Sequence, residues 1–348
     1  MKPPTEAQAV PLVIDLLSDF LAIPPASVDV RSRGSSGDIG SAISVAGYQF
    51  ISDYKPQASA AAVSQAIESL QRSDNPDGAI RLVVVPFMGD AGRGLCDRAE
   101  VSWLDLSGNA RVFAPGLRIQ VEGRPNKFVQ RGRPPNVFAP KSSRVARQLL
   151  LHPRRFQTQA ELARETGLGD GYVSKIANRL KQQQYLETDD TRAVRPANPD
   201  LMLDAWAEAY DFQHHRILAG HVPARSGFEL LELVGRRLTV ANDRPLWAAT
   251  GLAAAWLYTE FATFRLATFY LAAMPARSLL DQIGFVEETR GANLWFVLPD
   301  DDGVFQASRL EGEIRCVSPL QAYLDLKGHP ERANDAAAEL RRQRLTWS

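Results

Sequence analysis

The sequence TQAELARETGLGDGYVSKIANRLKQQQYLE, residues 158–187, decides the fold predicted for the centre of this chain. A first helix is expected from about Gln159, with Leu162 and Ala163 facing inward, and it ends at Gly167, because glycine adopts a positive φ at little cost. A second helical pattern begins near Asp170. Two helices joined by so tight a turn, with a residue as small as Ala163 at their crossing, predict a helix-turn-helix.

The second helix separates apolar from polar positions. Val173, Ile176 and Leu180 follow the helical repeat and are expected in the core. The other positions face outward and carry groups that hydrogen-bond to base edges in the major groove of DNA. They are Tyr172, Ser174, Lys175, Asn178, Arg179 and Lys181. The pattern predicts a DNA-recognition helix, and the alternative is a helix pair used only for packing or dimerisation.

The flanking segments complete a winged helix over residues 142–197. Residues 143–151 are amphipathic and predict a preceding helix. Residues 185–195 predict a short hairpin that carries Arg192 and Arg195 at its far end. Three helices and a hairpin in this order are typical of a DNA-binding module.

Charge is distributed unevenly along the chain although the net charge is zero. Residues 1–122 carry 10 basic and 14 acidic side chains, residues 123–196 carry 15 and 6, and residues 197–348 carry 15 and 20. A basic third between acidic flanks indicates a polyanionic partner, here double-stranded DNA. The side chains predicted to contact its phosphates are Arg144, Arg147, Arg192 and Arg195.

Residues 1–123 predict an α/β domain of a different kind. The expected elements are a helix over residues 5–21, strands over 27–31, 38–45 and 48–54, a helix over 59–70, a strand over 80–86, a helix over 92–98 and a strand over 101–106. Asp38 opens one hairpin strand, while Asp53 and Lys55 close its partner on one face, because strand side chains alternate. This arrangement resembles the PD-(D/E)xK superfamily, whose members are restriction-endonuclease-like nucleases.

That resemblance implies a catalytic set in the N-terminal domain. Asp38 and Asp53 would bind Mg²⁺, and Lys55 would orient the water that attacks a phosphodiester. Gly37 stands where the superfamily has proline, and the third carboxylate stays open. Its candidates are Asp15, Asp19 and Glu68. The alternative is solvated turn chemistry without catalysis, so the residues leave open whether the protein is an enzyme.

Residues 198–348 predict a mixed α/β domain. We expect helices over residues 201–210, 247–258 and 332–344, a helix that begins at Ser318, and strands over 267–271, 294–298 and 314–317. Residues 203–208, 250–255 and 317–326, placed after a winged helix, resemble the AbiEi family of type IV toxin-antitoxin systems. Residues 103–110 resemble the longer members of this family.

The AbiEi resemblance implies an antitoxin that represses its own promoter. It also implies a functional pairing with a nucleotidyltransferase toxin without a stable complex. The C-terminal domain itself resembles a degenerate nucleotidyltransferase. It is degenerate because Leu252 follows Gly251 where that enzyme needs serine, and because no D-x-D follows before Asp281. We therefore expect no nucleotidyl transfer.

Other polar clusters are interpreted structurally. Cys96 and Cys316 lack the spacing of a zinc site or a disulfide framework. Residues 300–302 are interpreted as a loop, and three histidines as exposed or capping side chains. These histidines are His214, His215 and His221.

Four segments are therefore expected in an α/β multidomain protein. They are a restriction-endonuclease-like domain over residues 1–123, a basic Pro-rich linker over 124–141, a winged helix-turn-helix over 142–197 and an α/β antitoxin domain over 198–348. The predicted function is sequence-specific DNA binding by a cytoplasmic transcriptional regulator that needs no cofactor. The alternatives are a Mg²⁺-dependent nuclease targeted by the winged helix and a scaffold that only dimerises. No membrane span is expected.

Overall fold

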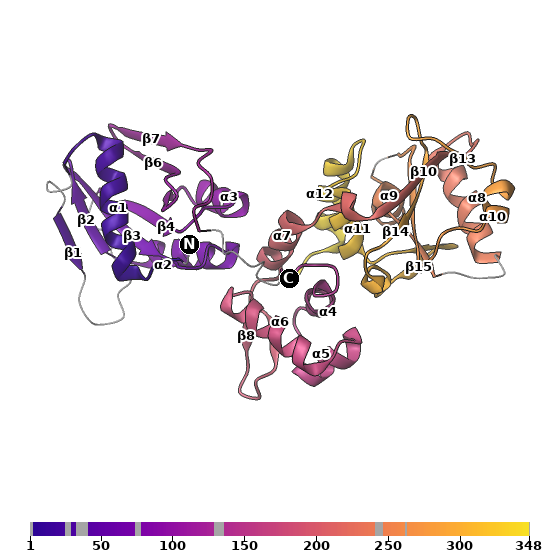
Figure 1. Cartoon of the computed structure of the whole chain (residues 1–348), viewed down its shortest axis with the longest axis horizontal. Helices are drawn as coiled ribbons and strands as arrows, with labels where there is room; N and C mark the ends of the chain where they lie inside the picture. Colours follow the sequence, from indigo (N-terminus) through magenta and orange to yellow (C-terminus); the bar gives the residue numbers. More distant parts are fainter. Residues whose placement is uncertain are drawn as a thin grey trace. The chain divides into compact units, whose positions relative to one another are not determined.

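A computed structural model describes residues 3–24, 29–32, 41–73, 78–128, 136–240, 246–261 and 263–347 (Figure 1). The chain is a mixed α/β protein that divides into two compact units. The first unit contains Met1–Asn136, Asn178–Glu187 and Asp200–Glu208, and the second contains Val137–Ala177, Thr188–Pro199 and Ala209–Ser348. No helix in the described part of the chain is long and apolar enough to cross a membrane.

A seven-stranded sheet whose strands follow the order of the sequence forms the centre of the first unit. The strands are β1 (Asp29–Ser32), β2 (Ser41–Val45), β3 (Tyr48–Tyr54), β4 (Ile80–Val85), β5 (Ser102–Asp105), β6 (Ala110–Ala114) and β7 (Leu117–Val121). Strands β3, β4 and β5 are parallel, and the other neighbours are antiparallel. Parallel neighbours need crossover helices, and α2 (Ala60–Arg72) and α3 (Asp90–Arg98) provide them. Through β5 this order agrees with the predicted one, and β6 and β7 extend the sheet beyond it.

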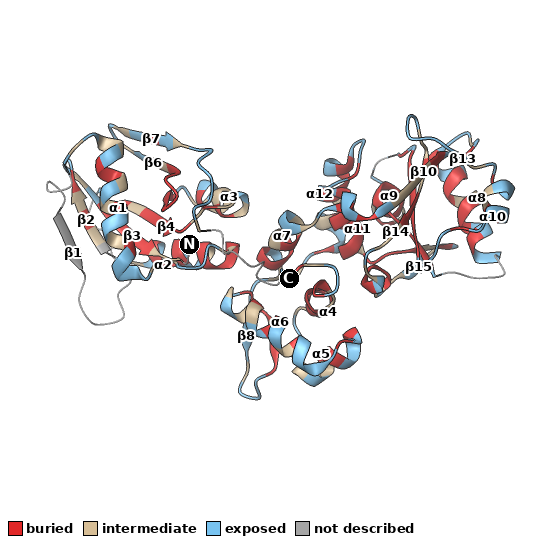
Figure 2. Ribbon diagram, viewed as in Figure 1, coloured by how far each residue is buried: buried red, intermediate tan, exposed pale blue. Residues whose placement is uncertain are grey.

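The two faces of this sheet bury different apolar sets because strand side chains alternate. Phe50 of β3 packs in one core with Val13 from α1 (Glu6–Leu21). Its neighbour Ile51 packs in a second core with Val63 of α2 and Trp103 of β5. Figure 2 shows the buried residues concentrated in the central strands and on the inner sides of the helices. One consequence is that Asp53 and Lys55 share the face of Ile51.

The turn between β5 and β6 is a closed structural unit. Asp105 is fully buried and accepts hydrogen bonds from the backbone N–H of Met88 over 3.1 Å and of Asn109 over 2.9 Å. The Asn109 side chain donates to Asp105 over 2.9 Å and accepts from the Arg124 N–H over 2.8 Å. Gly108 has a φ of 103°, where a side chain would also collide with Arg124. Backbone geometry and these hydrogen bonds therefore explain the turn.

The sequence marks clearly where the central helices begin and end. They are α4 (Ser143–Leu151), α5 (Gln159–Thr166) and α6 (Asp170–Gln182), followed by the two-stranded sheet of β8 (Leu186–Thr188) and β9 (Val194–Pro196). Thr158 caps α5 and forms a capping box with Glu161. Gly167 ends α5 with a φ of 68°, as its position predicted. Helix α6 begins in the second unit and ends in the first.

A second seven-stranded sheet, of mixed direction, organises the C-terminal part. Its order is β13 (Val286–Glu287), β10 (Arg216–His221), β14 (Leu294–Leu298), β12 (Ala267–Leu271), β11 (Trp247–Thr250), β16 (Ile314–Cys316) and β15 (Arg309–Glu311). The pairs β12–β14 and β11–β16 are parallel. Helix α7 (Pro199–Ala209) belongs almost entirely to the first unit. The helical elements that accompany this sheet are η2 (Phe212–His214), α8 (Gly227–Val240), α9 (Gly251–Thr259), α10 (Arg277–Gln282), η3 (Asp302–Phe305), α11 (Pro319–Leu326) and α12 (Ala333–Arg344).

One predicted helix in this part is wrong at its start. Residues 247–258 were expected to be helical, but Trp247–Thr250 form strand β11 and the helix begins only at Gly251. All four strand residues are buried, and β11 pairs with β12 and β16. Gly251 has a φ of 59° and makes the change of direction. A short apolar run does not distinguish a buried strand from a buried helix.

Candidate nucleic-acid interface

Helix α6 presents a polar stripe opposite its apolar face. Val173, Ile176, Ala177 and Leu180 are fully buried. Four exposed positions repeat at intervals of three and four residues, which places them in one line along the helix. They are Gly171, Lys175, Asn178 and Gln182, while Asp170 and Tyr172 at the start of the helix are exposed as well. Of the predicted base-contacting side chains, Tyr172, Lys175 and Asn178 are exposed, whereas Ser174, Arg179 and Lys181 are half-buried.

Tyr172 is held at the start of this helix by two neighbours that precede α4. Its hydroxyl lies 2.8 Å from the hydroxyl of Ser142, which is buried. The ammonium of Lys141 lies 5.9 Å from the centroid of the Tyr172 ring, a distance that permits a cation–π contact. The ring is 37% exposed, so it combines a fixed orientation with an accessible face. The sequence marks Lys141 only as one of the basic residues of the Pro-rich linker and not as a neighbour of Tyr172.

The hairpin after α6 holds its arginines by local contacts. The Asp189 carboxylate accepts from the backbone N–H of Thr191 over 3.0 Å and of Ala193 over 2.8 Å, which closes a tight turn. Arg192 in that turn is exposed and has a φ of 65°. The Arg195 guanidinium lies 4.3 Å from the centroid of the Phe156 ring. Both predicted wing arginines therefore lie on an ordered hairpin.

The two arginines of α4 do not have the surroundings predicted for phosphate contacts. Arg147 is 2% exposed, burial lowers the pKa of its guanidinium, and the charge of Asp325 opposes that shift. Arg144 donates from Nε and Nη2 to the two carboxylate oxygens of Asp301 over 2.6 and 2.9 Å. The prediction for both residues is corrected: Arg144 pairs with Asp301 of the C-terminal part, and Arg147 is enclosed in the interior. Helical periodicity shows which side chains share a face, but not what covers that face.

The remaining basic side chains of the segment fall into two groups. Arg155 and Arg164 each form an ion pair, with Glu161 over 2.8 Å and with Glu165 over 3.2 Å. In contrast, Lys175, Lys181 and Arg192 form no ion pair within the described ranges. Of these three side chains, the two lysines lie on α6 and Arg192 lies on the hairpin, which also carries the acidic residues Glu187, Asp189 and Asp190.

The N-terminal acidic site is described in part. Asp38 lies outside the described residues, whereas Asp53 is 3% exposed and its Oδ1 lies 3.1 Å from Nζ of Lys55. Burial raises the pKa of Asp53, and the Lys55 ammonium counteracts that shift. Oδ2 of Asp53 has no hydrogen-bond partner within the described part of the chain. The predicted neighbours Asp53 and Lys55 are therefore brought together.

The three carboxylates proposed as further metal ligands lie at the surface. Asp15, Asp19 and Glu68 are exposed, and Glu68 lies 3.8 Å from Arg72. Glu6 lines a small pocket with Ser52 and Tyr54, which alternate with Asp53 along β3 and therefore face the other side of the sheet.

A divalent cation needs several oxygen ligands, and this site offers one described free carboxylate oxygen, Oδ2 of Asp53. Within the described residues, no group of three or more His, Cys, Asp or Glu side chains is placed to hold a metal ion. The donor chemistry of Asp53 suits Mg²⁺, and a complete site would require oxygen ligands beyond the described set. Nζ of Lys55 lies beside the other oxygen of that carboxylate.

The C-terminal part contains a buried polar cluster that sequence reasoning missed. The Asp325 carboxylate accepts from the hydroxyls of Thr250, of Tyr210 over 2.5 Å and of Tyr270 over 3.0 Å, and from Gln321 over 2.6 Å. Asp325 is fully buried, and desolvation raises its pKa. Four donors satisfy this carboxylate, so the cluster stabilises the fold.

The histidines and residues 300–302 are placed as follows. His214 and His221 are exposed, as predicted. His215 is buried, contrary to the prediction, with Nε2 3.0 Å from the Tyr210 hydroxyl, and burial lowers its pKa. Asp301 caps η3 through the N–H of Gly303 over 2.8 Å.

Comparison of the chain with protein-family models, with curated proteins and with solved structures finds no match.

Proposed function

We propose that this protein binds double-stranded DNA sequence-specifically through α6 and the hairpin that follows it. The observation that carries the proposal is the exposed stripe of α6, where Lys175 and Asn178 project from a helix whose opposite face is fully buried. A short helix after a tight turn is the element that enters the major groove in helix-turn-helix proteins. The three helices with their hairpin support a winged-helix arrangement over residues 142–197.

Each side chain in this interface has a role that follows from its chemistry. Asn178 is suited to a bidentate contact with adenine, and Lys175 and Arg179 are suited to the acceptors of guanine. Tyr172 and Ser174 offer hydroxyls beside them. Arg192 and Arg195 on the hairpin are placed to contact phosphates. Base contacts on the helix would give specificity, while the hairpin arginines would give affinity and orientation.

We further propose that the biological role is that of an AbiEi-like antitoxin repressing its own promoter in the cytoplasm. The order of a restriction-endonuclease-like sheet domain, a winged helix and a mixed α/β domain without nucleotidyltransferase aspartates supports this role. Its toxin would be a nucleotidyltransferase that forms no stable complex with it. DNA binding in this role requires no cofactor.

A gel-shift titration with the DNA upstream of the protein's own gene tests the function. The wild type should bind this duplex more tightly than a shuffled duplex, and the variant with Asn178→Ala and Arg179→Ala should lose the difference. The matched control is Arg277→Ala, because Arg277 is exposed on α10 and pairs with Asp281 of the same helix over 3.0 Å. Equal affinity for both duplexes, unchanged by the double substitution, would exclude sequence-specific recognition.

A second candidate function, Mg²⁺-dependent DNA cleavage, is supported by the Asp53–Lys55 pair. A bound Mg²⁺ would stabilise the charge that develops on the phosphate. Asp38 and Asp53 would hold the ion, while Lys55 would orient a water molecule beside Asp53. Plasmid incubated with protein and Mg²⁺ tests this candidate. Cleavage by the wild type and not by Lys55→Ala supports it, whereas cleavage by both, or by neither, counts against this site.

A further inference from the structure

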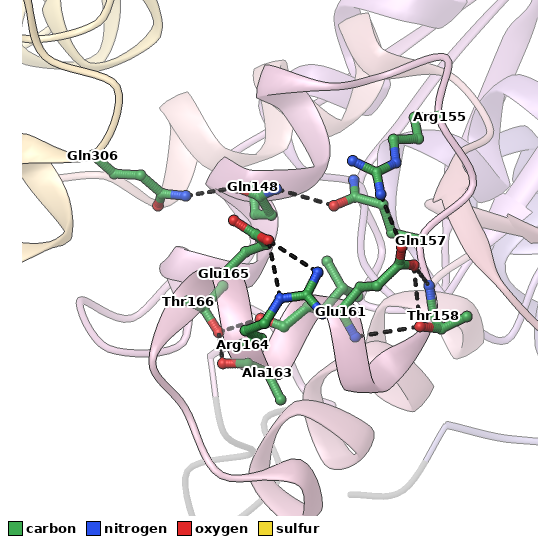
Figure 3. Close-up of polar contacts among 11 residues, drawn as sticks. Gln148, Arg155, Gln157, Thr158, Glu161, Ala163, Arg164, Glu165, Thr166 and Gln306 are labelled. Carbon is green, nitrogen blue, oxygen red and sulfur yellow. Dashed lines mark hydrogen bonds and ion pairs between the residues drawn. The ribbon is translucent and has the colours of Figure 1, made fainter.

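Three glutamine amides form a chain from Gln306 through Gln148 to Gln157 within the second unit (Figure 3). Gln306 donates from Nε2 to Oε1 of Gln148 over 2.7 Å, and Gln148 donates from Nε2 to Oε1 of Gln157 over 3.0 Å. Gln148 and Gln157 are 4% and 1% exposed, so water does not compete for these bonds. Nε2 of Gln157 has no partner within the described residues, which leaves Gln148 to orient this amide.

The first end of the chain is anchored twice on α4. Helix η3 lies between Asp301 and Gln306, and these two residues bond to Arg144 and Gln148 of α4. Arg144 and Gln148 are four residues apart, which places them on successive turns of one helix face. The segment around η3 therefore fixes both the position and the rotation of α4.

The second end of the chain reaches the hairpin through the backbone. Gln157 and Val194 of β9 exchange two backbone hydrogen bonds, each of 2.9 Å. Arg195 is the next residue after Val194, and its guanidinium lies over the ring of Phe156, the residue before Gln157. A shift of Gln157 would thus move the strand and the ring that position Arg195.

We propose that Gln148 is a positioning residue for the hairpin, which couples the η3 segment to the phosphate contact of Arg195. The inference rests on the proposed DNA binding and names the element of the C-terminal part that adjusts it. Gln148 itself does not touch DNA. Without Gln148, the side chain of Gln157 loses the donor that orients it. The backbone of Gln157 and its partner β9 are then held less firmly, and Arg195 adopts the orientation that a phosphate requires less often.

The test uses the full chain with Gln148→Met, a side chain of similar length that makes neither amide bond. Gln157→Met breaks the same bond from the other side and serves as the second variant. Gln49→Met is the matched control, because Gln49 is exposed on β3. Each protein is titrated with the upstream duplex at several salt concentrations, and thermal melts establish that it is folded.

We expect Gln148→Met to weaken binding about fivefold to tenfold, the effect of one lost hydrogen bond. The slope of log Kd against log salt should fall by about one, as in Arg195→Ala. Adding Arg195→Ala to Gln148→Met should then change little, because both act on one phosphate contact. A purely structural role would leave the effect of Arg195→Ala intact.

Two results would overturn different claims. If the wild type binds the duplex and Arg195→Ala keeps its full effect in both folded glutamine variants, the positioning role is wrong and the proposed function stands. If the wild type shows no duplex binding even at low salt, the proposed function fails, and the positioning role fails with it. Should Gln148→Met not fold, Gln157→Met decides the outcome. If neither folds, the amide chain is a folding element and the positioning role is rejected.

Discussion

Arg144 of α4 donates two hydrogen bonds to Asp301, 157 residues later in the chain, over 2.6 and 2.9 Å. The two side chains are 25% and 13% exposed, so solvent screens the pair only in part. The contact explains why an arginine from the most basic segment is not available to a phosphate. It also gives α4 a defined rotation on the C-terminal part.

The first prediction concerns the stability that this pair provides. Arg144→Ala and Asp301→Ala should each lower the free energy of unfolding by about 1–3 kcal/mol, because each leaves a charged partner that is only partly solvated. The double variant should cost less than the sum of the two. Urea denaturation measures these values. The exposed Arg277–Asp281 pair is the control, and its loss should cost below about 0.5 kcal/mol. Strict additivity at Arg144 and Asp301 would contradict the prediction.

The second prediction compares two glycines in one turn. Gly167 has a φ of 68°, whereas Gly169 is exposed and has open space where a Cβ would lie. Gly167→Ala should destabilise the protein by about 1 kcal/mol, because a Cβ is disfavoured at positive φ. Gly169→Ala should have little effect. Thermal melts of the two variants provide the measurement, and equal melting temperatures would show that the turn tolerates a Cβ.

The third prediction concerns pH and His329. Burial lowers the pKa of His329 from 6.5 to about 4, and its Nε2 lies 2.9 Å from the Thr268 hydroxyl. A depressed histidine pKa contributes stability that is complete above pH 6.5 and is lost as the pH falls towards 4. Between pH 7 and pH 5 this loss should amount to about 2 kcal/mol.

Comparison with His329→Gln isolates this contribution, because the other titrating groups, including His215, are common to both proteins. The variant should be less stable than the wild type at pH 7, and the difference should shrink at pH 5. Tryptophan fluorescence is a suitable probe, since the ring of Trp295 lies 5.4 Å from that of His329. A difference that stays constant from pH 7 to pH 5 would refute the assignment.

The fourth prediction separates base contacts from phosphate contacts. Asn178→Ala should cost about 1–3 kcal/mol on the specific duplex and little on a shuffled one. Arg192→Ala should weaken binding to both duplexes alike and reduce the salt slope by about one. Fluorescence anisotropy at a series of salt concentrations measures both effects. The reverse pattern would mean that the hairpin, and not α6, carries specificity.

Local signals in the sequence predicted much of the fold. The order of helices and strands through β5, the end of α5 at Gly167 and the buried face of α6 all follow from periodicity, capping and glycine geometry. The start of α9 did not follow, because residues 247–250 are apolar in a manner that suits either a buried strand or a buried helix. Pairing with β12 and β16 decided it.

In the candidate sites, too, some features follow from the local sequence and others from tertiary contacts. The sequence alone determined that α6 would have one apolar and one polar face, because 3.6 residues per turn fix which side chains share a side. It also determined that Asp53 and Lys55 would share a face of β3, because strand side chains alternate. Only the tertiary structure decided which partners and which surroundings Arg144, Arg147 and Gln148 have. A helix pattern is a property of neighbouring residues, whereas the surface that covers a helix comes from segments more than a hundred residues away.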